Sequence, residues 1–570
     1  MPSPPPTAPL LPFLVALLVA GVSQAIISTP LNLYWLQLLS FAPALVVLSK
    51  AEGHRAWLGG WLLGASANAA IFAWLVPTVG RFTTLGEFGG LSVLLLFAAA
   101  FGFYGAVFGW GAAAVRRASG RLWPLGLAAW FVACEFLNPQ LFPYYQGVAW
   151  YQVPRVFLVS AVTGVPGITF GVIALNGLLA VGWETWRGSV PREQSLATLR
   201  RSGAVLTALL LVGLGYAQVR HTEVSRAMAT SESRRFALIQ TNVDVPAMRA
   251  LFREDRNAYR ENLLALTREA LADDPDIDIV VWPEGAIRGR LDHPRRAEVL
   301  ELAREYEVTI WTGAVGSRGP KDALTRYNGG FIISPDGRVS EPYDKNILVP
   351  FGEYMPLVSV LPFLGKIRAF PSVSPGESPA VLESPNVAGV GFLVCYEATR
   401  PRYLRAQVRE GARFLSTVTF DGWFGDTAAL DQHMMLAATM SAAMGLPQVR
   451  AATTGISMAT GADGVLLGRT DRAARTWLAV DVPLAALPSA YARLGDWFAW
   501  LCILAGFVLA CSGPRRPHGG LPTRLLRHLV PLAFLSAAPV AWFINPHSPM
   551  LDSLVWGAAV LITLRAALRK

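Results

Sequence analysis

The sequence predicts two kinds of structure in one chain, a membrane α-helical bundle and an α/β domain. Of the 570 residues, 53% are hydrophobic and only 15% are charged, and the mean hydropathy is +0.40. This composition is too apolar for a soluble protein. Long apolar runs fill the first third of the chain, whereas residues 235–485 carry charged residues and shorter apolar runs of strand length.

The first third of the chain contains a series of apolar runs that we predict to cross a bilayer, which takes about 20 residues each. They lie near residues 9–27, 31–49, 56–78, 89–115, 122–137, 156–183 and 204–219. We expect the first run to be an anchor. No Lys or Arg precedes it, so the basic segment of a cleaved signal peptide is missing.

The basic residues between these runs predict the orientation, because the cytoplasmic loops of membrane proteins carry an excess of Lys and Arg. With the N-terminus inside, the inner connections carry Lys50, Arg55, Arg116, Arg117, Arg121, Arg187, Arg192, Arg200 and Arg201. The outer connections hold little beyond Arg81 and Arg155. Seven crossings then deliver the chain to the outer side near residue 220.

The middle of the chain alternates strand and helix patterns. Strands are expected at residues 236–240, 277–282, 308–315, 330–334, 389–395, 413–418, 448–454 and 465–468. Helices are expected at about 254–272, 293–306, 400–411 and 428–445. Asp336-Gly337 and Asp463-Gly464 are typical of hairpin turns. This alternation predicts a layered α/β domain with covered sheets.

After this domain, residues 494–511 form another apolar run that returns the chain inside, where Arg515 and Arg516 follow. Two further runs, about 529–544 and 550–564, are expected to form a hairpin. We therefore expect a membrane bundle at 1–220, the α/β domain at 221–490 and a C-terminal membrane segment at 491–570. The α/β domain would be inserted between the seventh and eighth membrane helices.

Charge and cysteine content exclude several classes of protein. The formal charge is +10, but the basic residues lie between apolar runs and form no nucleic-acid-binding signature, so no nucleic acid is expected. Four cysteines are too few for a disulfide framework, and Cys395 is alone in the polar part of the chain. No paired cysteines or histidines indicate a metal, and none is expected.

Cys395 follows the apolar run Val387–Val394, which is typical of a buried strand. A thiol at a strand end, with acids and a lysine at other strand ends, is the arrangement of a covalent catalyst. Taken alone, Cys395 fits a small buried hydrophobic residue better than a catalyst, because most free cysteines are packing residues.

Two further strand-end segments carry the acids and the lysine. In the first, an apolar strand runs into Pro283 and then Glu284; we expect the proline to end the strand and to leave the glutamate at the rim of the sheet. The second runs from Tyr343 to Tyr354 and contains Lys345 and Glu353. Each charged residue alone could be an ordinary exposed side chain.

In order and spacing, Trp-Pro-Glu at 282–284, the 343–354 segment and Cys-Tyr-Glu at 395–397 resemble the nitrilase superfamily of Glu-Lys-Cys enzymes. Together with the preceding apolar runs, residues 10–511 resemble the apolipoprotein N-acyltransferase family. The resemblance implies an α-β-β-α sandwich. It implies that Cys395 is the nucleophile, Glu284 the general base, Lys345 the oxyanion-stabilising cation and Glu353 a second required acid.

The resemblance also implies the substrates and their contacts. Tyr396, Glu397 and Trp423 are expected to bind substrate. The donor is expected to be a phospholipid, phosphatidylethanolamine, and the acceptor the diacylglyceryl-cysteine of an apolipoprotein. No cofactor is implied. The location is the bacterial inner membrane, with the catalytic domain in the periplasm.

Two segments are candidate lids over the site. Residues 355–373 are apolar for a loop, and we expect them to contact lipid and to cover an acyl tunnel. Residues 420–425 are the second candidate; a packed glycine-rich turn is an equal alternative. The chain departs from the family pattern at Phe420, at Ser441–Pro447 and at Thr453.

Two other functions remain open at this point. A membrane-tethered amidase would use the same thiol but let water resolve the acyl-enzyme. A non-catalytic membrane scaffold would need no thiol, and the acid, lysine and cysteine in this order argue against it.

Overall fold

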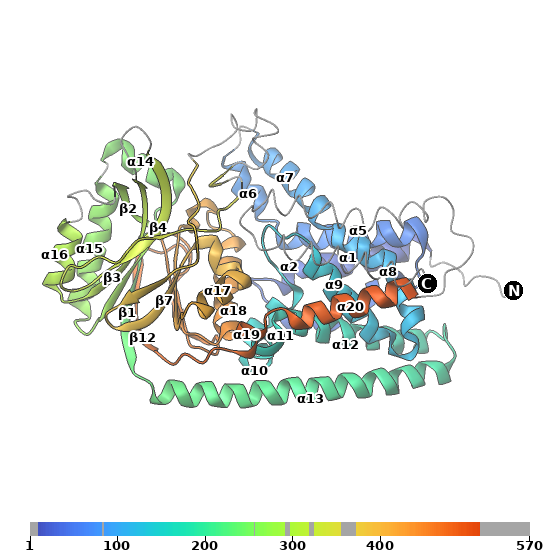
Figure 1. Cartoon of the computed structure of the whole chain (residues 1–570). Helices are drawn as coiled ribbons and strands as arrows, with labels where there is room; N and C mark the ends of the chain where they lie inside the picture. Colours follow the sequence, from blue (N-terminus) through green and yellow to red (C-terminus); the bar gives the residue numbers. More distant parts are fainter. Residues whose placement is uncertain are drawn as a thin grey trace. The chain divides into compact units, whose positions relative to one another are not determined.

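The computed structural model describes residues 9–82, 85–255, 257–290, 297–318, 324–350, 352–354 and 372–512. The chain forms two compact units (Figure 1). The first contains residues 1–149, 163–215 and 496–570; the second contains 150–162 and 216–495. The loop expected at 355–373, up to residue 371, and the hairpin expected at 529–564 lie outside the described residues.

The first unit is built of helices, as expected. They are α1 (Leu10–Val22), α2 (Gln24–Ile27), α3 (Gln37–Ser40), α4 (Ala42–Leu48), α5 (Gly53–Ile71), α6 (Leu75–Gly80), α7 (Gly86–Phe101), α8 (Phe103–Ser119), α9 (Trp123–Leu137), α12 (Val165–Trp186) and α20 (Trp497–Ser512). The first part of α13 (Arg192–Thr230) also belongs to it.

Four stretches in the described chain are long and apolar enough to cross a membrane: Leu10–Ile27, Gly86–Leu137, Val165–Trp186 and Arg192–Thr230. Shorter apolar helices cover Tyr34–Leu48, Pro154–Thr163 and Trp497–Ser512. The chain is therefore an integral membrane protein by its helices, while the number of crossings stays a prediction. The run expected at 89–115 is two helices, α7 and α8, which meet at Gly102.

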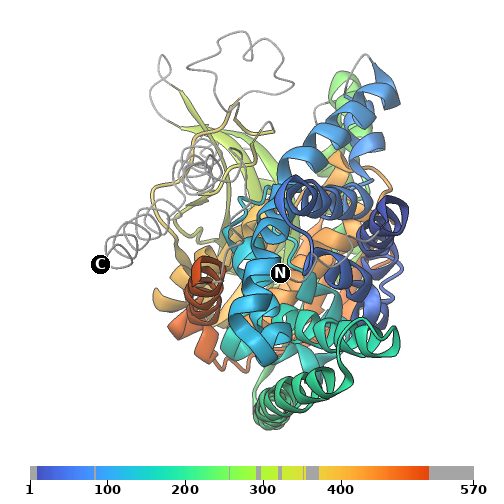
Figure 2. The same cartoon turned by 90° about the vertical axis from the view of Figure 1, so that its right-hand side faces the viewer.

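Small residues let helices α5 and α8 approach closely (Figure 1 and Figure 2). A Cβ atom on Gly60 would lie 2.0 Å from the carbonyl oxygen of Gly105, and one on Gly64 would lie 2.3 Å from that of Gly102. No side chain fits these positions. Such contacts favour helix association in membranes, where dispersion replaces the hydrophobic effect.

The second unit contains two six-stranded sheets, ordered β12-β1-β2-β3-β4-β5 and β11-β10-β9-β8-β7-β6. The first sheet consists of β1 (Ser233–Gln240), β2 (Ile279–Arg290), β3 (Thr309–Arg318), β4 (Thr325–Ile333), β5 (Tyr343–Asp344) and β12 (Thr476–Pro483). The second consists of β6 (Val381–Ser384), β7 (Val387–Val394), β8 (Phe414–Thr419), β9 (Gln448–Ala452), β10 (Met458–Thr460) and β11 (Leu466–Arg469).

Helices cover the outer faces of both sheets. They are α14 (Val245–Glu254), α15 (Ala258–Asp273) and α16 (Ala297–Glu305) around the first sheet, and α17 (Pro401–Arg409) and α18 (Ala428–Met444) around the second; α19 (Ala490–Leu494) follows. Leu263 of α15 and Leu302 of α16 are fully buried in one core with β2 and β3.

The two sheets pack face to face through aromatic side chains. The ring of Phe414 on β8 stacks on Phe236 of β1, with centroids 5.3 Å apart, and meets Trp311 of β3 edge-on at 5.6 Å. Aromatic pairs at such distances stabilise the contact beyond the area that they bury. Helix, sheet, sheet and helix therefore follow one another, the order that the family resemblance implies.

Candidate active site

Cys395 lies where strand β7 ends and a short 3₁₀ helix, η6 (Cys395–Thr399), begins. Strands β7, β8 and β9 are parallel neighbours, so their carboxyl ends meet at one edge of the sheet, where α/β folds place their ligands. The backbone φ of Cys395 is +55°. A left-handed conformation costs about 1–3 kcal/mol for a residue with a side chain and is common at active sites. The half-buried thiol is thus held on a sharp turn.

Glu284 also lies in the described sheet, but the expectation that Pro283 ends its strand is wrong. Strand β2 pairs with β3 on both sides of the proline, and residues 283–286 form a bulge between the pairs Trp282–Thr312 and Ile287–Ala314. The residues of a bulge are unpaired, so the N–H that proline lacks is not needed for the sheet, and the bulge changes the direction of the strand. Gly313, opposite the bulge, leaves room for it, because a Cβ there would lie 2.6 Å from the Cα of Glu284. Glu284 is buried as a result, at 9% exposure.

Lys345 follows β5 and is buried beside Glu353. Its Nζ atom lies 2.8 Å from Oε2 of Glu353, and its side chain is 1% exposed. Oε2 of Glu353 also accepts a hydrogen bond from the backbone N–H of Val349, at 2.8 Å. A buried ammonium is tolerated only when it is paired in this way.

Asn328 of β4 joins the two carboxylates. Its Nδ2 donates to Oε1 of Glu284 at 2.6 Å and to Oε1 of Glu353 at 2.8 Å. The other oxygen of Glu284 accepts a hydrogen bond from the backbone N–H of Phe420, also at 2.8 Å. Segments that are far apart in sequence therefore meet around one carboxamide. Sequence reasoning missed Asn328, because its position in a Tyr-Asn-Gly-Gly strand carries no signal until β4 is paired.

The electrostatics of the site keep the thiol neutral and the lysine charged. Burial raises the pKa of the Cys395 thiol above its ordinary value, and Glu284 raises it further, while Lys345 opposes both. Burial also raises the pKa of Glu284, against the effect of Lys345. Burial alone would lower the pKa of Lys345, but Glu353 and Glu284 raise it above its ordinary value. A carboxylate with a raised pKa beside a neutral thiol is suited to accept the thiol proton.

Glu397, expected to bind substrate, is fully buried and holds protein groups. It accepts hydrogen bonds from the Tyr343 hydroxyl and from the backbone N–H groups of Asn346, Ile347 and Val394, at 2.7–3.1 Å. Burial raises its pKa to about 7, although Lys345 lowers it. This carboxylate ties the segment after Lys345 to the turn that carries Cys395.

The other two expected substrate residues are Tyr396, which follows Cys395 directly, and Trp423, which lies three residues after Phe420. Tyr396 is buried at 5% exposure, and the Arg400 guanidinium lies 4.2 Å from the centre of its ring. Trp423 is half-buried and meets Phe420 edge-on, with ring centroids 6.0 Å apart. The candidate lid at 420–425 is a packed turn around the short helix η7 (Asp421–Trp423).

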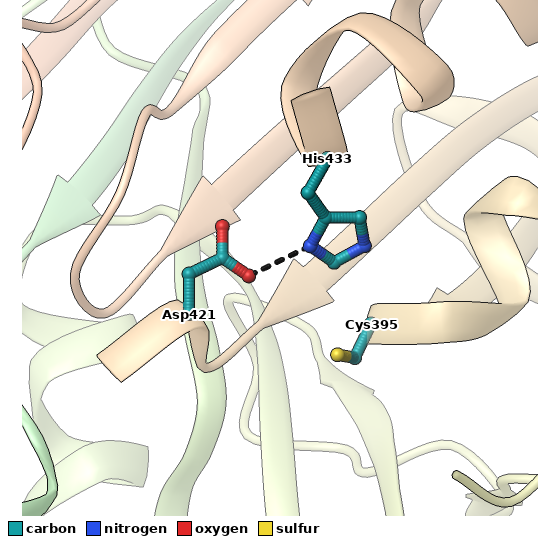
Figure 3. Close-up of side chains that lie close together, drawn as sticks. All are labelled: Cys395, Asp421 and His433. Carbon is teal, nitrogen blue, oxygen red and sulfur yellow. Dashed lines mark hydrogen bonds and ion pairs between the residues drawn. The ribbon is translucent and has the colours of Figure 1, made fainter. Parts of the chain in front are cut away.

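A cluster of Asp421, His433 and Arg450 lies beside Cys395 and was also missed from the sequence. Nδ1 of His433 lies 2.8 Å from Oδ1 of Asp421, and Nη2 of Arg450 donates to Oδ2 of Asp421 at 2.6 Å. Figure 3 shows Asp421 and His433 facing each other with the sulfur of Cys395 nearby. Because these residues come from three separate elements, no spacing in the sequence indicates the cluster.

The thiol, carboxylate and imidazole of this cluster lie within 4.8 Å of one another, as metal ligands do. However, Asp421 already binds both His433 and the Arg450 guanidinium, a fixed cation that repels a metal ion. The cluster is therefore better suited to support the turn. Thr419 extends it, because its hydroxyl donates to Asp421 and also hydrogen-bonds to the Cys395 side chain.

Replacing Asp421 by Asn is expected to lower the free energy of unfolding by about 3–5 kcal/mol, because it leaves Arg450 buried without its anion. Burial would raise the pKa of Asp421, but Arg450 and His433 hold it at about 2. Its stabilising effect is thus complete above the ordinary pKa near 4 and is lost as the pH falls through about 2.

Thermal unfolding of parent and variant at several pH values tests this prediction. The difference in stability should be constant from pH 7 to about 4 and should shrink below that. Asp426→Asn removes a carboxylate that is 66% exposed and is the control, with a change within about 0.5 kcal/mol. A difference that persists unchanged at pH 2 would contradict the assignment.

Two family models match the chain. Carbon-nitrogen hydrolase matches residues 235–491, and the apolipoprotein N-acyltransferase N-terminal domain matches residues 20–178. In structure, a nitrilase-superfamily protein of Saccharomyces cerevisiae matches with a TM-score of 0.35 and 15% identity, over 44% of this chain and 90% of its own.

Curated relatives match most of the sequence. The apolipoprotein N-acyltransferase of Geobacter metallireducens is 32% identical over 491 residues, which is 84% of this chain and 91% of the relative. The enzyme of that name from Bdellovibrio bacteriovorus is 27% identical over 76% of this chain and 82% of its own. By this similarity along most of its length, the chain belongs to the apolipoprotein N-acyltransferase family.

Proposed function

We propose that the protein transfers a fatty acyl chain from a phospholipid to the α-amino group of a diacylglyceryl-cysteine at the N-terminus of an apolipoprotein. Membership of the family supports this reaction. The observation that carries the mechanism is the meeting of Glu284, Lys345 and Glu353 around Asn328, beside the strained turn of Cys395.

In the first step, Glu284 takes the proton of the Cys395 thiol, and the thiolate attacks an ester carbonyl of the phospholipid. Lys345 and the backbone N–H groups at the start of η6 stabilise the negative oxygen that develops. Loss of one such donor typically costs about 3–4 kcal/mol. The carbon–oxygen bond of the ester then breaks, and the departing alkoxide of the lysophospholipid takes the proton from Glu284. A thioester remains on Cys395.

In the second step, the free amine of the acceptor attacks the thioester carbonyl. Glu284 accepts the proton that the amine loses, and the Cys395 thiolate leaves as the amide forms. The thiolate then regains its proton from Glu284, which restores the resting site. Two half-reactions that share one covalent intermediate constitute a ping-pong mechanism.

We assign Glu397 a positioning role in place of substrate contact. Its four hydrogen bonds to protein groups support this, since they leave the carboxylate fully buried. Tyr396, which follows Cys395 directly, and Trp423, whose ring meets that of Phe420, are proposed to contact the substrates. Glu353 would hold Lys345 in place as its counter-ion.

Both substrates carry acyl chains, and moving such chains out of a bilayer costs about 0.8 kcal/mol per CH₂ group. A catalyst attached to membrane helices avoids this cost. We propose that residues 1–220 and 491–570 anchor the catalytic domain, residues 221–490, on the periplasmic side of the bacterial inner membrane. Phosphatidylethanolamine is the proposed donor.

The proposal is tested by mass spectrometry of Cys395 in the full-length protein. Incubation with phospholipid alone should add one acyl chain to Cys395, and this thioester should persist until a diacylglyceryl-cysteine peptide is added. The peptide should then gain the chain. Rapid release of free fatty acid without the peptide would favour the water-resolved amidase, which family membership does not favour.

A further inference from the structure

His433 lies beside Cys395 but has no part in the proton transfers of Glu284. It is buried on α18, and one of its ring nitrogens, a carboxylate oxygen of Asp421 and Sγ of Cys395 lie within 4.8 Å of one another. Figure 3 shows the imidazole facing Asp421, with Cys395 nearby. The imidazole also hydrogen-bonds to the backbone of Cys395. His433 is therefore in contact with the main chain of the residue that carries the thiol.

Asp421 and Arg450 fix the orientation of the imidazole. Nδ1 of His433 lies 2.8 Å from Oδ1 of Asp421. An ionised carboxylate can only accept a hydrogen bond, so Nδ1 carries the proton of this bond. The carboxylate is itself held, because Arg450 donates to its other oxygen at 2.6 Å and both side chains are fully buried. Nη2 of Arg450 also lies 3.1 Å from Nδ1. Since Nδ1 is surrounded in this way, the other ring nitrogen, Nε2, is left for the Cys395 backbone.

The segment that holds the imidazole also contacts both partners of the first proton transfer. Residues 419–421 lie at the carboxyl end of β8. The Thr419 hydroxyl hydrogen-bonds to the Cys395 side chain. The backbone N–H of Phe420 donates to Oε2 of Glu284 at 2.8 Å. The third residue of the segment is the aspartate that binds the imidazole. One segment therefore sets the positions of the thiol and of the proposed base relative to each other.

We propose that His433 is a positioning residue of the acyl-transfer reaction, which holds the Cys395 turn so that the thiol stays aligned with Glu284. This inference rests on the proposed function and adds a residue to it. The turn has a φ of +55°, a conformation that persists only where surrounding contacts hold it. The hydrogen bond from the imidazole to the Cys395 backbone is one such contact. A displacement of about 1 Å at a reacting group lowers the rate about 100-fold.

Two substitutions separate the two hydrogen bonds of the imidazole. His433→Asn places an amide nitrogen near the position of Nδ1, so it keeps the bond to Asp421 and loses the bond to Cys395. His433→Gln places an amide nitrogen near the position of Nε2 and does the reverse. The measurement is thioester formation on Cys395 in the full-length protein with dipalmitoyl phosphatidylethanolamine, followed by mass spectrometry.

The kcat of this step should fall about 100-fold in the Asn variant and less than about tenfold in the Gln variant. The KM for the phospholipid should change less than about threefold in both, because neither variant removes a substrate contact. Thermal unfolding should rank the two variants in the opposite order. The Asn variant keeps the bond to Asp421, so it should be the more stable of the two although it is the less active. A purely structural role would give the same order for stability and activity.

His54→Asn is the matched control, since His54 is exposed on α5 in the helical unit. It should leave kcat unchanged. A His433→Asn protein that is as active as the Gln variant, or more active, would overturn the inference, because the bond to Cys395 would then not matter. A parent protein that forms no thioester would instead refute the proposed function, and the inference with it.

Discussion

Replacing Cys395 by serine is expected to abolish acyl transfer, with a loss of about 10³-fold or more. Serine keeps the size and position of the side chain, so the turn at φ +55° should survive. A hydroxyl, however, is a much weaker acid than a thiol, and Glu284 cannot ionise it to a useful extent. A serine would also form an ester, which is less reactive toward an amine than a thioester.

The measurement is transfer of a labelled acyl chain to a diacylglyceryl-cysteine peptide, with mass spectrometry of residue 395. Cys511→Ser is the matched control, because Cys511 is exposed on α20 and belongs to the helical unit. It should keep full activity. Transfer by the Cys395→Ser protein at more than a few per cent of the parent rate would contradict the nucleophile assignment.

Much of the fold was predictable because its signals are local. Strand and helix periodicities, together with a turn such as Asp336-Gly337, depend on neighbouring residues, and most elements expected in the second unit are observed within a few residues. Strand β2 extends further than expected, and β5, β6, β10, β12 and α14 were not expected. Length and apolarity also indicated the helical unit. The division at Gly102 was not predictable, because α7 and α8 are both apolar and a run of apolar residues does not mark where one helix ends.

The candidate site was predictable only where a residue directly follows a recognisable strand or motif. Cys395, Glu284 and Lys345 satisfy this condition. Asn328 does not, since its role appears only when β4 is placed beside the bulge of β2. The same bulge explains why the expectation that Pro283 ends its strand was wrong. Pro283 lies among unpaired residues, where the N–H that proline lacks would make no hydrogen bond to the neighbouring strand.

Lys345 is expected to matter both for the stability of the protein and for its chemistry. Replacing it by Met keeps much of its volume but removes the positive charge that pairs with Glu353 and also interacts with Glu284. Breaking a buried ion pair by removing one partner typically costs about 3–5 kcal/mol. We expect this loss of unfolding free energy near neutral pH, together with complete loss of thioester formation.

The pH dependence follows from the sign of the pKa shifts. Without Lys345, the pKa of Glu284 should rise further above its ordinary value, because the lysine is what opposes the effect of burial. Below the unfolded pKa of a carboxyl group, near 4, the group is protonated in both the folded and the unfolded state, so a raised folded pKa costs no stability there. As the pH rises toward the folded pKa, the unfolded state ionises more readily, and the folded state becomes relatively less stable. Unfolding of the Lys345→Met protein should therefore approach that of the parent at pH 4 and diverge toward pH 7.

A second variant separates charge balance from catalysis. Lys345→Met combined with Glu353→Gln removes a carboxylate together with the cation, so it should recover part of the lost unfolding free energy at pH 7. It should not recover thioester formation, because the developing oxyanion still lacks its cation. Recovered stability with absent chemistry would support the catalytic role of Lys345. Recovered activity would mean that the lysine only balances the two acids, and the oxyanion would then depend on the backbone N–H groups of the Cys395 turn.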